Sequence, residues 1–170
     1  SGIKIPIIIA NPGTKSTQKI IDNKLDVVIY NTELLDLYGK LDKEIRIHIK
    51  FDTGMNRYGF GASEVDKLVA DLQKYPKLKI QSICSHLAAS DNSEKDSFTN
   101  DQFQVFENVS NSFSKGINQL IDKHILNTNG VLRFPKKEYE MVRLGIGLYG
   151  VSDDNNLQQV STLKSVISQV

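Results

Sequence analysis

Four short stretches of the sequence gather side chains that could bind an anion or move a proton. They are KFDTGMNRYGF at 50–60, CSHLAASD at 84–91, LNTNG at 126–130 and MVRLGIGLYG at 141–150. Arginine is a permanently charged planar donor for phosphates, carboxylates and ring nitrogens, and histidine can transfer protons near neutral pH. Each stretch alone is a weak signal, so the prediction depends on all four meeting at one place.

Two arginines and one histidine are the strongest candidates for chemistry. For Arg57 and Arg143 the ordinary alternative is a surface ion pair. Arg143 is less easily explained in that way, because Val142 and Leu144 flank it in an apolar run. His86 follows an apolar strand pattern and could be structural or a proton-transfer group.

The other two histidines, His48 and His124, lack comparable polar neighbours in the sequence, although His124 precedes the LNTNG stretch. We therefore do not include them in the predicted site. The three histidines show no metal-ligand spacing, so we expect no zinc site.

A single phosphate is the anion that the remaining groups suit. Asn127 and Thr128 offer an amide and a hydroxyl, and Gly145, Ile146 and Gly147 offer backbone N–H groups that a ligand can approach closely. The sequence contains no Walker lysine loop, GxSxG elbow or HExxH motif. Tight packing beside a bend is the alternative reading of the Gly-Ile-Gly segment.

The elements that must position these groups alternate along the chain. The spacing of apolar residues predicts helices at 14–23, 32–40, 62–74 and 99–122, and strands at 5–9, 26–30, 44–51, 79–85, 125–127 and 141–144. Strands that alternate with helices indicate βαβ units and a largely parallel sheet. In such folds ligands lie at the carboxyl ends of strands, which is where the four stretches fall.

Local signals refine these elements. Ser63 and Thr99, followed three residues later by Asp66 and Gln102, are predicted helix starts. The apolar opening segment 1–10 is predicted to be a buried strand, and neither a signal peptide nor a membrane span.

Composition limits the partners. A chain of 170 residues, 39% hydrophobic and 24% charged, predicts one globular domain. The net charge of +1 gives no field to attract nucleic acid or an anionic membrane. Cys84 is the single cysteine, so no internal disulfide can form, and a reducing cytosol is the expected compartment.

The four stretches resemble, in the same order, blocks of the alanine racemase family. The matching blocks are 50–60, 85–91, 127–135 and 141–150, and the resemblance covers essentially the whole chain. It implies a fold-type III pyridoxal 5′-phosphate (PLP) enzyme, with a (β/α)₈ barrel followed by a β-rich domain, acting as a homodimer in the bacterial cytoplasm. Such enzymes interconvert L- and D-alanine for peptidoglycan, with PLP as the electron sink.

The resemblance also implies roles for the catalytic candidates. Arg143 matches the arginine that hydrogen-bonds the pyridine nitrogen, and His86 matches the histidine that links this arginine to a catalytic tyrosine. Arg57 matches the arginine near the cofactor's phenolic oxygen and the substrate. Lys50 matches a lysine that is carbamylated in some members and then pairs with that arginine.

The phosphate end of the cofactor is assigned by the same resemblance. Thr128, Gly145 and Ile146 match the phosphate cradle, and Asn127 matches the asparagine of the same block. Thr128 stands where the family usually has serine, which keeps the hydroxyl.

Two family blocks have no match here, the cofactor lysine block and the tyrosine of the C-terminal β domain. The expected fold class is therefore α/β, a partial (β/α)₈ TIM-like barrel of parallel strands that lacks the first strands and the C-terminal β domain. Residues 1–160 would form about barrel strands three to eight, and residues 161–170 would begin the connection to that domain. Alone, the segment is expected to be inactive and, with two open sheet edges, to associate or rearrange.

Two alternatives remain open. The chain could be a non-catalytic PLP-binding homologue of the same barrel family. It could also be an unrelated doubly wound α/β binding module, in which Arg57, His86 and Arg143 would lie far apart instead of sharing a cleft.

Overall fold

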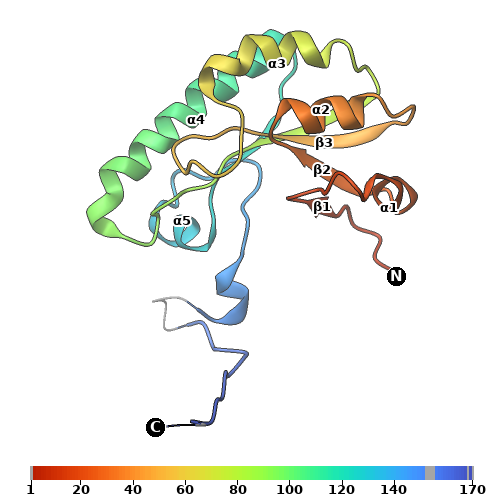
Figure 1. Cartoon of the computed structure of the whole chain (residues 1–170). Helices are drawn as coiled ribbons and strands as arrows, with labels where there is room; N and C mark the ends of the chain where they lie inside the picture. Colours follow the sequence, from red (N-terminus) through yellow and green to blue (C-terminus); the bar gives the residue numbers. More distant parts are fainter. Residues whose placement is uncertain (1, 152–155, 168, 170) are drawn as a thin grey trace.

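A five-stranded parallel sheet forms the centre of the molecule (Figure 1). The computed structural model describes residues 2–151, 156–167 and 169. The strands lie side by side in chain order, and they are β1 (Ile8–Ile9), β2 (Asp26–Ile29), β3 (Ile45–Lys50), β4 (Leu78–Cys84) and β5 (Asp122–His124). A doubly wound sheet reverses its strand order at a switch point, whereas a barrel does not. The order therefore confirms a partial TIM-like barrel.

A helix follows each strand. They are α1 (Thr17–Asp22), α2 (Thr32–Gly39), α3 (Val65–Leu72), α4 (Asp96–Ile117) and α5 (Thr128–Arg133), with 3₁₀ turns η1 (Ala62–Glu64), η2 (Ser93–Lys95) and η3 (Ile146–Tyr149). Helices α2, α3 and α4 cover one face of the sheet (Figure 1). Asn31 begins α2 by accepting a hydrogen bond from the Leu34 N–H at 2.9 Å, which satisfies one of the donors that a helix start leaves unpaired.

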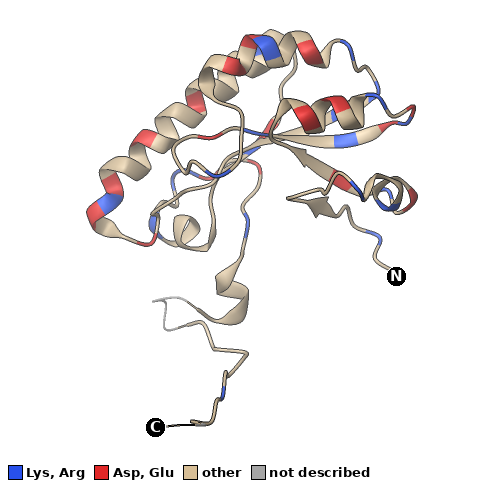
Figure 2. Cartoon of the chain, in the orientation of Figure 1, with Lys and Arg blue, Asp and Glu red and all other residues tan. Residues whose placement is uncertain are grey.

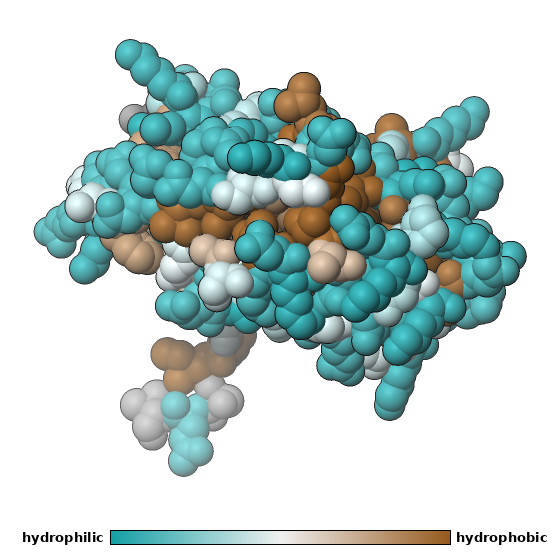
Figure 3. All heavy atoms as spheres, turned by 90° about the horizontal axis from the view of Figure 1, so that it is seen from above, coloured by the Kyte–Doolittle hydropathy of each residue, from teal (hydrophilic) through white to brown (hydrophobic). Residues whose placement is uncertain are grey.

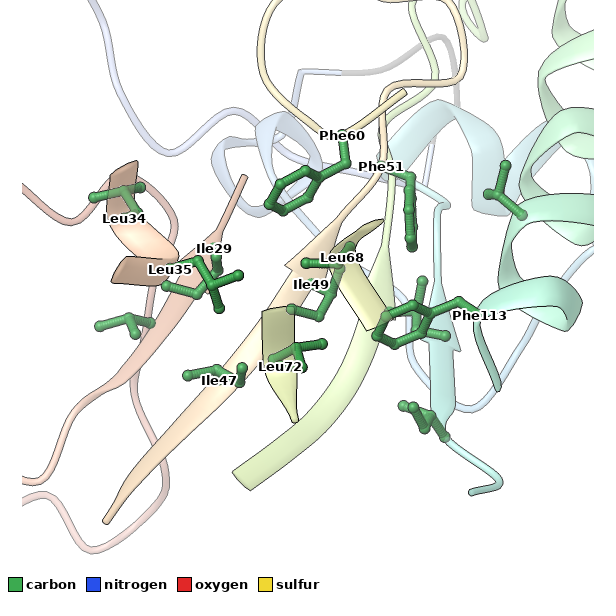
Figure 4. Close-up of a cluster of buried hydrophobic side chains, with 14 of the residues drawn as sticks. Ile29, Leu34, Leu35, Ile47, Ile49, Phe51, Phe60, Leu68, Leu72 and Phe113 are labelled. Carbon is green, nitrogen blue, oxygen red and sulfur yellow. The ribbon is translucent and has the colours of Figure 1, made fainter. Parts of the chain in front are cut away.

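The hydrophobic core lies between the sheet and these helices (Figure 4). Ile47 and Ile49 of β3 are fully buried there. Phe113 of α4 meets Phe51 edge to face, with ring centroids 5.6 Å apart. Each such side chain contributes roughly 1.5–3 kcal/mol through burial, so this face holds the sheet and helices together.

Polar side chains occupy the opposite face of the sheet. Successive strand residues point to opposite faces, and β3 alternates buried isoleucines with Arg46, His48 and Lys50. Between β3 and β4 the register shifts, so that Ile47 pairs with Ile80 but His48 pairs with Ser82. The extra residue on β4 acts as a β-bulge and places Ser82 on the same face as His48.

The central elements agree with the sequence. Strands β2, β3 and β4 and helix α2 match their predictions to within one residue at each end. Two strand predictions were wrong. The fifth strand is Asp122–His124 and not 125–127, and 141–144 forms no strand. In the described part of the chain, only the N–H groups of Met141 and Arg143 bond from 141–144 to backbone carbonyls, those of Lys123 in β5 and Leu126 after it. Two bonds are too few for a regular ladder.

Predictions at the sheet edge and at the helix ends also needed correction. The opening segment is not a buried strand, because only Ile8–Ile9 pair and Ile5 is 74% exposed on the uncovered edge. Helix α4 begins at Asp96, so Thr99 lies inside it, and it ends at Ile117 because Asn118 turns left-handed with φ 52°. At the start of η1 the Glu64 carboxylate accepts from the Gly61 N–H at 2.7 Å, so Ser63 is not the cap.

Acidic and basic residues are interspersed along the helices and loops (Figure 2). Seen from the helix side, apolar atoms show as a band between polar ones (Figure 3). Within the described residues, no helix combines the length and the apolar character that crossing a bilayer needs.

Candidate active site at the carboxyl ends of the strands

The loop that follows β3 is built by its own polar and glycine residues. The Asp52 carboxylate accepts from the N–H groups of Gly54 at 2.9 Å and Asn56 at 3.1 Å. Gly59 has φ 138°, and a Cβ there would lie 2.3 Å from the Asp52 nitrogen, so only glycine fits. Asp52 thus has a structural role in the stretch 50–60, because it folds the loop back over the end of the strand.

A buried glutamine ties this loop to the one after β4. Gln102 of α4 is fully buried, accepts from the Ala88 N–H at 2.9 Å and donates to the His86 carbonyl at 3.1 Å. Its amide also lies 3.3 Å from the Thr53 hydroxyl, which contacts the Ser85 hydroxyl at 2.8 Å. The backbone that carries His86 is therefore fixed from both sides.

Arg143 is held by carbonyl groups at the ends of β4 and β5. Its guanidinium donates to the carbonyls of Ser85 at 2.5 Å and of His124 and Ile125 at 3.2 Å each. Its Nη2 atom also lies 3.3 Å from Nδ1 of His86. Since 141–144 is not a strand, these hydrogen bonds and not a sheet ladder position the arginine.

Burial and positive neighbours keep the histidines beside Arg143 neutral. Burial, helped by the charges of Arg143 and Lys50, lowers the pKa of His86 to about 4. Burial and Arg143, followed by His48 and Lys50, lower the pKa of His124 to about 3. Burial also lowers the pKa of the Lys50 ammonium, which favours its neutral form.

The predicted phosphate residues also meet. The Thr128 hydroxyl accepts from the N–H groups of Gly145 at 3.0 Å and Gly147 at 3.2 Å. The Asn127 amide oxygen caps α5 by accepting from the Gly130 N–H at 2.9 Å, and it also accepts from the Ser90 hydroxyl. Asn127 thus shapes the start of α5 through its oxygen.

A hollow of about 230 Å³ collects most of the predicted residues. It is lined by His86, Asn127, Thr128, Asn129, Arg143, Leu144, Gly145 and Ile146. Arg57 is not among them. It is exposed and makes no hydrogen bond or ion pair within the part of the chain that the structure describes, but its charge still helps to lower the pKa of His86 and Lys50.

Sequence reasoning missed two residues that the structure brings to this site. His124 was set aside, yet its Nδ1 atom contacts the Arg143 guanidinium directly. His48 was set aside too, yet it reaches His124 through Ser82. The alternation Arg46, His48, Lys50 in β3 is a signal that could have found His48, because it puts three polar side chains on one face. It says nothing about His124, which lies in β5.

Comparisons with known sequences give one consistent result. A family model described as alanine racemase, N-terminal domain, matches residues 1–153. Alanine racemase 1 of Oceanobacillus iheyensis is 32% identical over 99% of this chain and 46% of its own length. The alanine racemase of Treponema denticola is 30% identical over 100% of this chain and 47% of its own. The chain therefore spans about half the length of the curated relatives it matches.

Solved structures agree on the fold. Alanine racemase from Corynebacterium glutamicum has a TM-score of 0.82 at 22% identity, covering 93% of this chain and 46% of that chain. The enzyme from Bacillus anthracis with bound L-Ala-P has 0.79 at 27%, covering 91% and 41%. The enzyme from Bartonella henselae with covalently bound pyridoxal phosphate has 0.79 at 22%, covering 94% and 47%.

Proposed function

The chain belongs to the alanine racemase family, and we propose that it supplies the part of a PLP-dependent alanine racemase that holds the cofactor. The substrates would be L- and D-alanine. The observation that carries the proposal is the hollow in which Arg143, His86 and Thr128 meet. The family match and the unreversed strand order exclude the alternative of an unrelated doubly wound module.

The residues around the hollow fit the chemistry of PLP. Both Nη atoms of Arg143 already face protein acceptors, so in the described residues Nε–H is the free donor. Arginine cannot lose this proton, which suits an unprotonated ring nitrogen. Thr128 offers a hydroxyl, and the N–H groups of Thr128 and Asn129 begin α5 and have no partner inside the helix. With the N–H of Ile146, and with that of Gly145 once it leaves the Thr128 hydroxyl, they would hold the phosphate. The hollow is smaller than the roughly 300–1,000 Å³ of ordinary ligand sites, which suits a site completed by other parts of a longer protein.

When bound, PLP supplies the electron sink for proton removal at the α-carbon. The residues of this chain would bind and tune it. Arg143 would hold the ring nitrogen without protonating it, and neutral His86 would hold Arg143 and connect it toward the acid/base group on that side. Arg57, on the loop after β3, would face the phenolic oxygen and the substrate carboxylate.

Lys50 has the surroundings that a carbamylated lysine needs. Carbamylation requires a neutral amine, and burial lowers the Lys50 pKa in that direction. A carbamate would carry a negative charge among Arg57 and Arg143, whose positive charges already act on Lys50. We include carbamylation of Lys50 in the proposal.

The wider arrangement follows from the family. We propose that residues 1–160 are the barrel segment and that residues 161–170 begin a connection to a β domain. The longer protein would act as a homodimer in the cytoplasm and supply D-alanine for peptidoglycan. By itself, the 170-residue chain would not racemise alanine, because nothing in it matches the family's cofactor lysine or catalytic tyrosine.

Binding of pyridoxamine 5′-phosphate tests the proposal. This fluorescent analogue cannot form an imine with surface lysines, so it reports the hollow alone. We expect saturable binding to the 170-residue chain and roughly tenfold weaker binding to Thr128→Val, which loses one charge-assisted hydrogen bond of about 1.5 kcal/mol. Thr99→Val is the matched control, because Thr99 is buried in α4 and its hydroxyl has no partner in the described residues.

Two results would contradict the proposal. The first is absence of saturable binding by a folded chain, or equal binding by both threonine variants. The second concerns activity. Racemisation of L-alanine by the chain with added PLP, in a preparation free of host racemase, would show that the missing lysine and tyrosine are not needed.

A further inference from the structure

A line of buried polar side chains crosses the sheet on the face opposite the core. Asp26, His48, Ser82 and His124 come from four successive strands, and each is between 0% and 4% exposed. Nδ1 of His48 lies 2.6 Å from the Ser82 hydroxyl, which lies 2.9 Å from Nε2 of His124. Nδ1 of His124 contacts Nη1 of Arg143, so the line ends at the candidate site.

The chemistry of Arg143 fixes the direction of the hydrogen bonds along this line. A guanidinium only donates, so Nδ1 of His124 must accept and the proton of this ring must lie on Nε2. That proton goes to the Ser82 oxygen, which leaves the Ser82 hydrogen to donate to Nδ1 of His48. His48 then carries its own proton on Nε2, which has no hydrogen-bond partner in the described residues and faces the Asp26 carboxylate at an ion-pair distance of 3.5 Å.

Both ends of the line carry a fixed charge. Asp26 is held by Arg46, whose Nε donates to its carboxylate at 2.7 Å. Arg143 at the other end is a permanent cation. A line that runs from a cation to a carboxylate favours one orientation of every donor between them. His86 should have the same tautomer, with its proton on Nε2, because its Nδ1 also faces a nitrogen of Arg143.

A packing role alone does not explain these residues. Burying a polar group costs free energy unless it is hydrogen-bonded, and an apolar residue could fill the same space without that cost. None of the four lines the hollow. In the described residues, no three His, Cys, Asp or Glu side chains come together as metal ligands. What the four residues share is a connected route to Arg143.

We propose that His48, Ser82 and His124 are positioning residues that orient the guanidinium of Arg143 through one directional line of hydrogen bonds, and that the charge of the Asp26 carboxylate beyond His48 favours this direction. The line gives His124 a single tautomer whose lone pair faces Arg143. This inference rests on the proposed function in one respect, because Arg143 is the group that would face the cofactor ring. The direction of the line itself does not depend on any cofactor.

Histidine side-chain NMR tests the line without a ligand. The chain has three histidines, so long-range ¹H–¹⁵N spectra of the ¹⁵N-histidine-labelled chain at pH 7 contain three ring patterns, which single substitutions assign. We expect all three rings to be neutral with the proton on Nε2. A proton on Nδ1 of His48 or His124, or a doubly protonated ring at either position, would overturn the proposal. Because the expected pattern is the same for all three rings, the wild-type spectrum alone can support the proposal, and substitutions are needed only to assign a ring that differs.

Substitution of the central link gives a second readout. In Ser82→Ala we expect His124 to lose its acceptor and His48 its donor, so both patterns move toward mixed tautomers. Ser82→Thr keeps the hydroxyl and should preserve the wild-type patterns. Ser110→Ala is the matched control, because Ser110 is fully buried and its hydroxyl has no partner in the described residues. Unchanged His48 and His124 patterns in folded Ser82→Ala would refute the line.

Pyridoxamine 5′-phosphate separates this inference from the proposed function. If both hold, Ser82→Ala weakens binding by roughly tenfold, which is the size typical of a partner that orients a ligand-contacting residue, and Ser110→Ala leaves it unchanged. If the tautomers are as expected but the wild-type chain binds nothing, the proposed function fails and the line stands. If the wild-type chain binds and Ser82→Ala binds equally well, the positioning role fails and the proposed function stands.

Discussion

The two faces of the sheet are both buried, but they are held in different ways. On the helix side, β3 presents Ile47 and Ile49 to an apolar core. On the other side, the same strand presents His48, which is 3% exposed and hydrogen-bonded to Ser82. The stability of the first face depends on buried contact area, so the volume that a substitution removes decides the loss in unfolding free energy. The second depends on hydrogen-bond partners, so the loss of one partner decides the cost in unfolding free energy.

The core should give the largest single effect. Phe113→Ala removes a fully buried ring that packs on Phe51, and we expect a loss of about 3–5 kcal/mol in the free energy of unfolding. Urea denaturation measures it. Leu120→Ala is the control, because Leu120 is 97% exposed. A loss below about 1 kcal/mol for Phe113→Ala would mean that this face is not a packed core.

Gln102 connects the helix layer to the candidate site and should give the next largest effect. Gln102→Leu keeps the approximate volume but leaves the Ala88 N–H and the His86 carbonyl without this partner. We expect a loss of at least about 2 kcal/mol, at 1–3 kcal/mol for each of the two unpaired groups. Gln104→Leu is the control, because within the described residues the Gln104 side chain bonds only to Asn108, on the exposed surface of α4. Equal unfolding free energies for the two variants would contradict this role.

The polar face should make stability depend on pH. Burial lowers the pKa of His124 to about 3 from an ordinary value of 6.5, so below pH 6.5 the unfolded chain takes up a proton that the folded chain refuses. The stability that the folded chain gains by keeping His124 neutral is therefore fully present above pH 6.5 and is lost as pH falls toward 3. Between pH 6.5 and 5 we expect His124 to account for about 2 kcal/mol of lost stability.

A variant separates the effect of His124 on stability from the effect of titrating carboxylates. His124→Asn removes the titrating ring, so urea denaturation of the variant should show a shallower fall in stability between pH 6.5 and 5. The same slope in both proteins would show that His124 does not stay neutral in the folded state.

The smallest expected effect on unfolding free energy is the difference between alanine substitutions at two buried serines, Ser82 and Ser110. Ser82→Ala leaves the ring nitrogens of His48 and His124 without their shared partner, and we expect a cost of about 1–2 kcal/mol. Ser110→Ala removes a hydroxyl that bonds to nothing in the described residues, so it should be neutral or slightly stabilising. Equal unfolding free energies would remove the distinction between a paired and an unpaired polar group.

The same distinction explains how much could be predicted from sequence. Alternation of apolar residues predicted β3 and its helix-facing core, because period two is a local signal. The family blocks led to Arg143, His86 and Thr128, which the structure brings to one hollow. The buried polar line was not predicted, because it joins four strands and includes a register shift between β3 and β4. Pairing across strands and an inserted residue are tertiary facts that no local pattern contains.

The segment 141–144 shows a second limit. Its apolar residues around Arg143 have the pattern of a strand, and a strand was predicted. In the structure the Arg143 guanidinium donates hydrogen bonds to the carbonyls of Ser85, His124 and Ile125. Within the described residues, the backbone N–H groups of 141–144 make only two hydrogen bonds to backbone carbonyls. The sequence thus indicated the residue correctly but not the way in which it is held.

The central claim is that Arg143 holds the ring nitrogen of a pyridoxal-type cofactor. The ¹⁵N spectrum of ring-labelled pyridoxamine 5′-phosphate bound to the 170-residue chain tests it most directly. We predict an unprotonated nitrogen that accepts a hydrogen bond at pH 7, and a signal that moves toward that of the free ligand in Arg143→Ala. A protonated ring in the complex, or a bound signal that does not change when Arg143 is replaced, would contradict the claim.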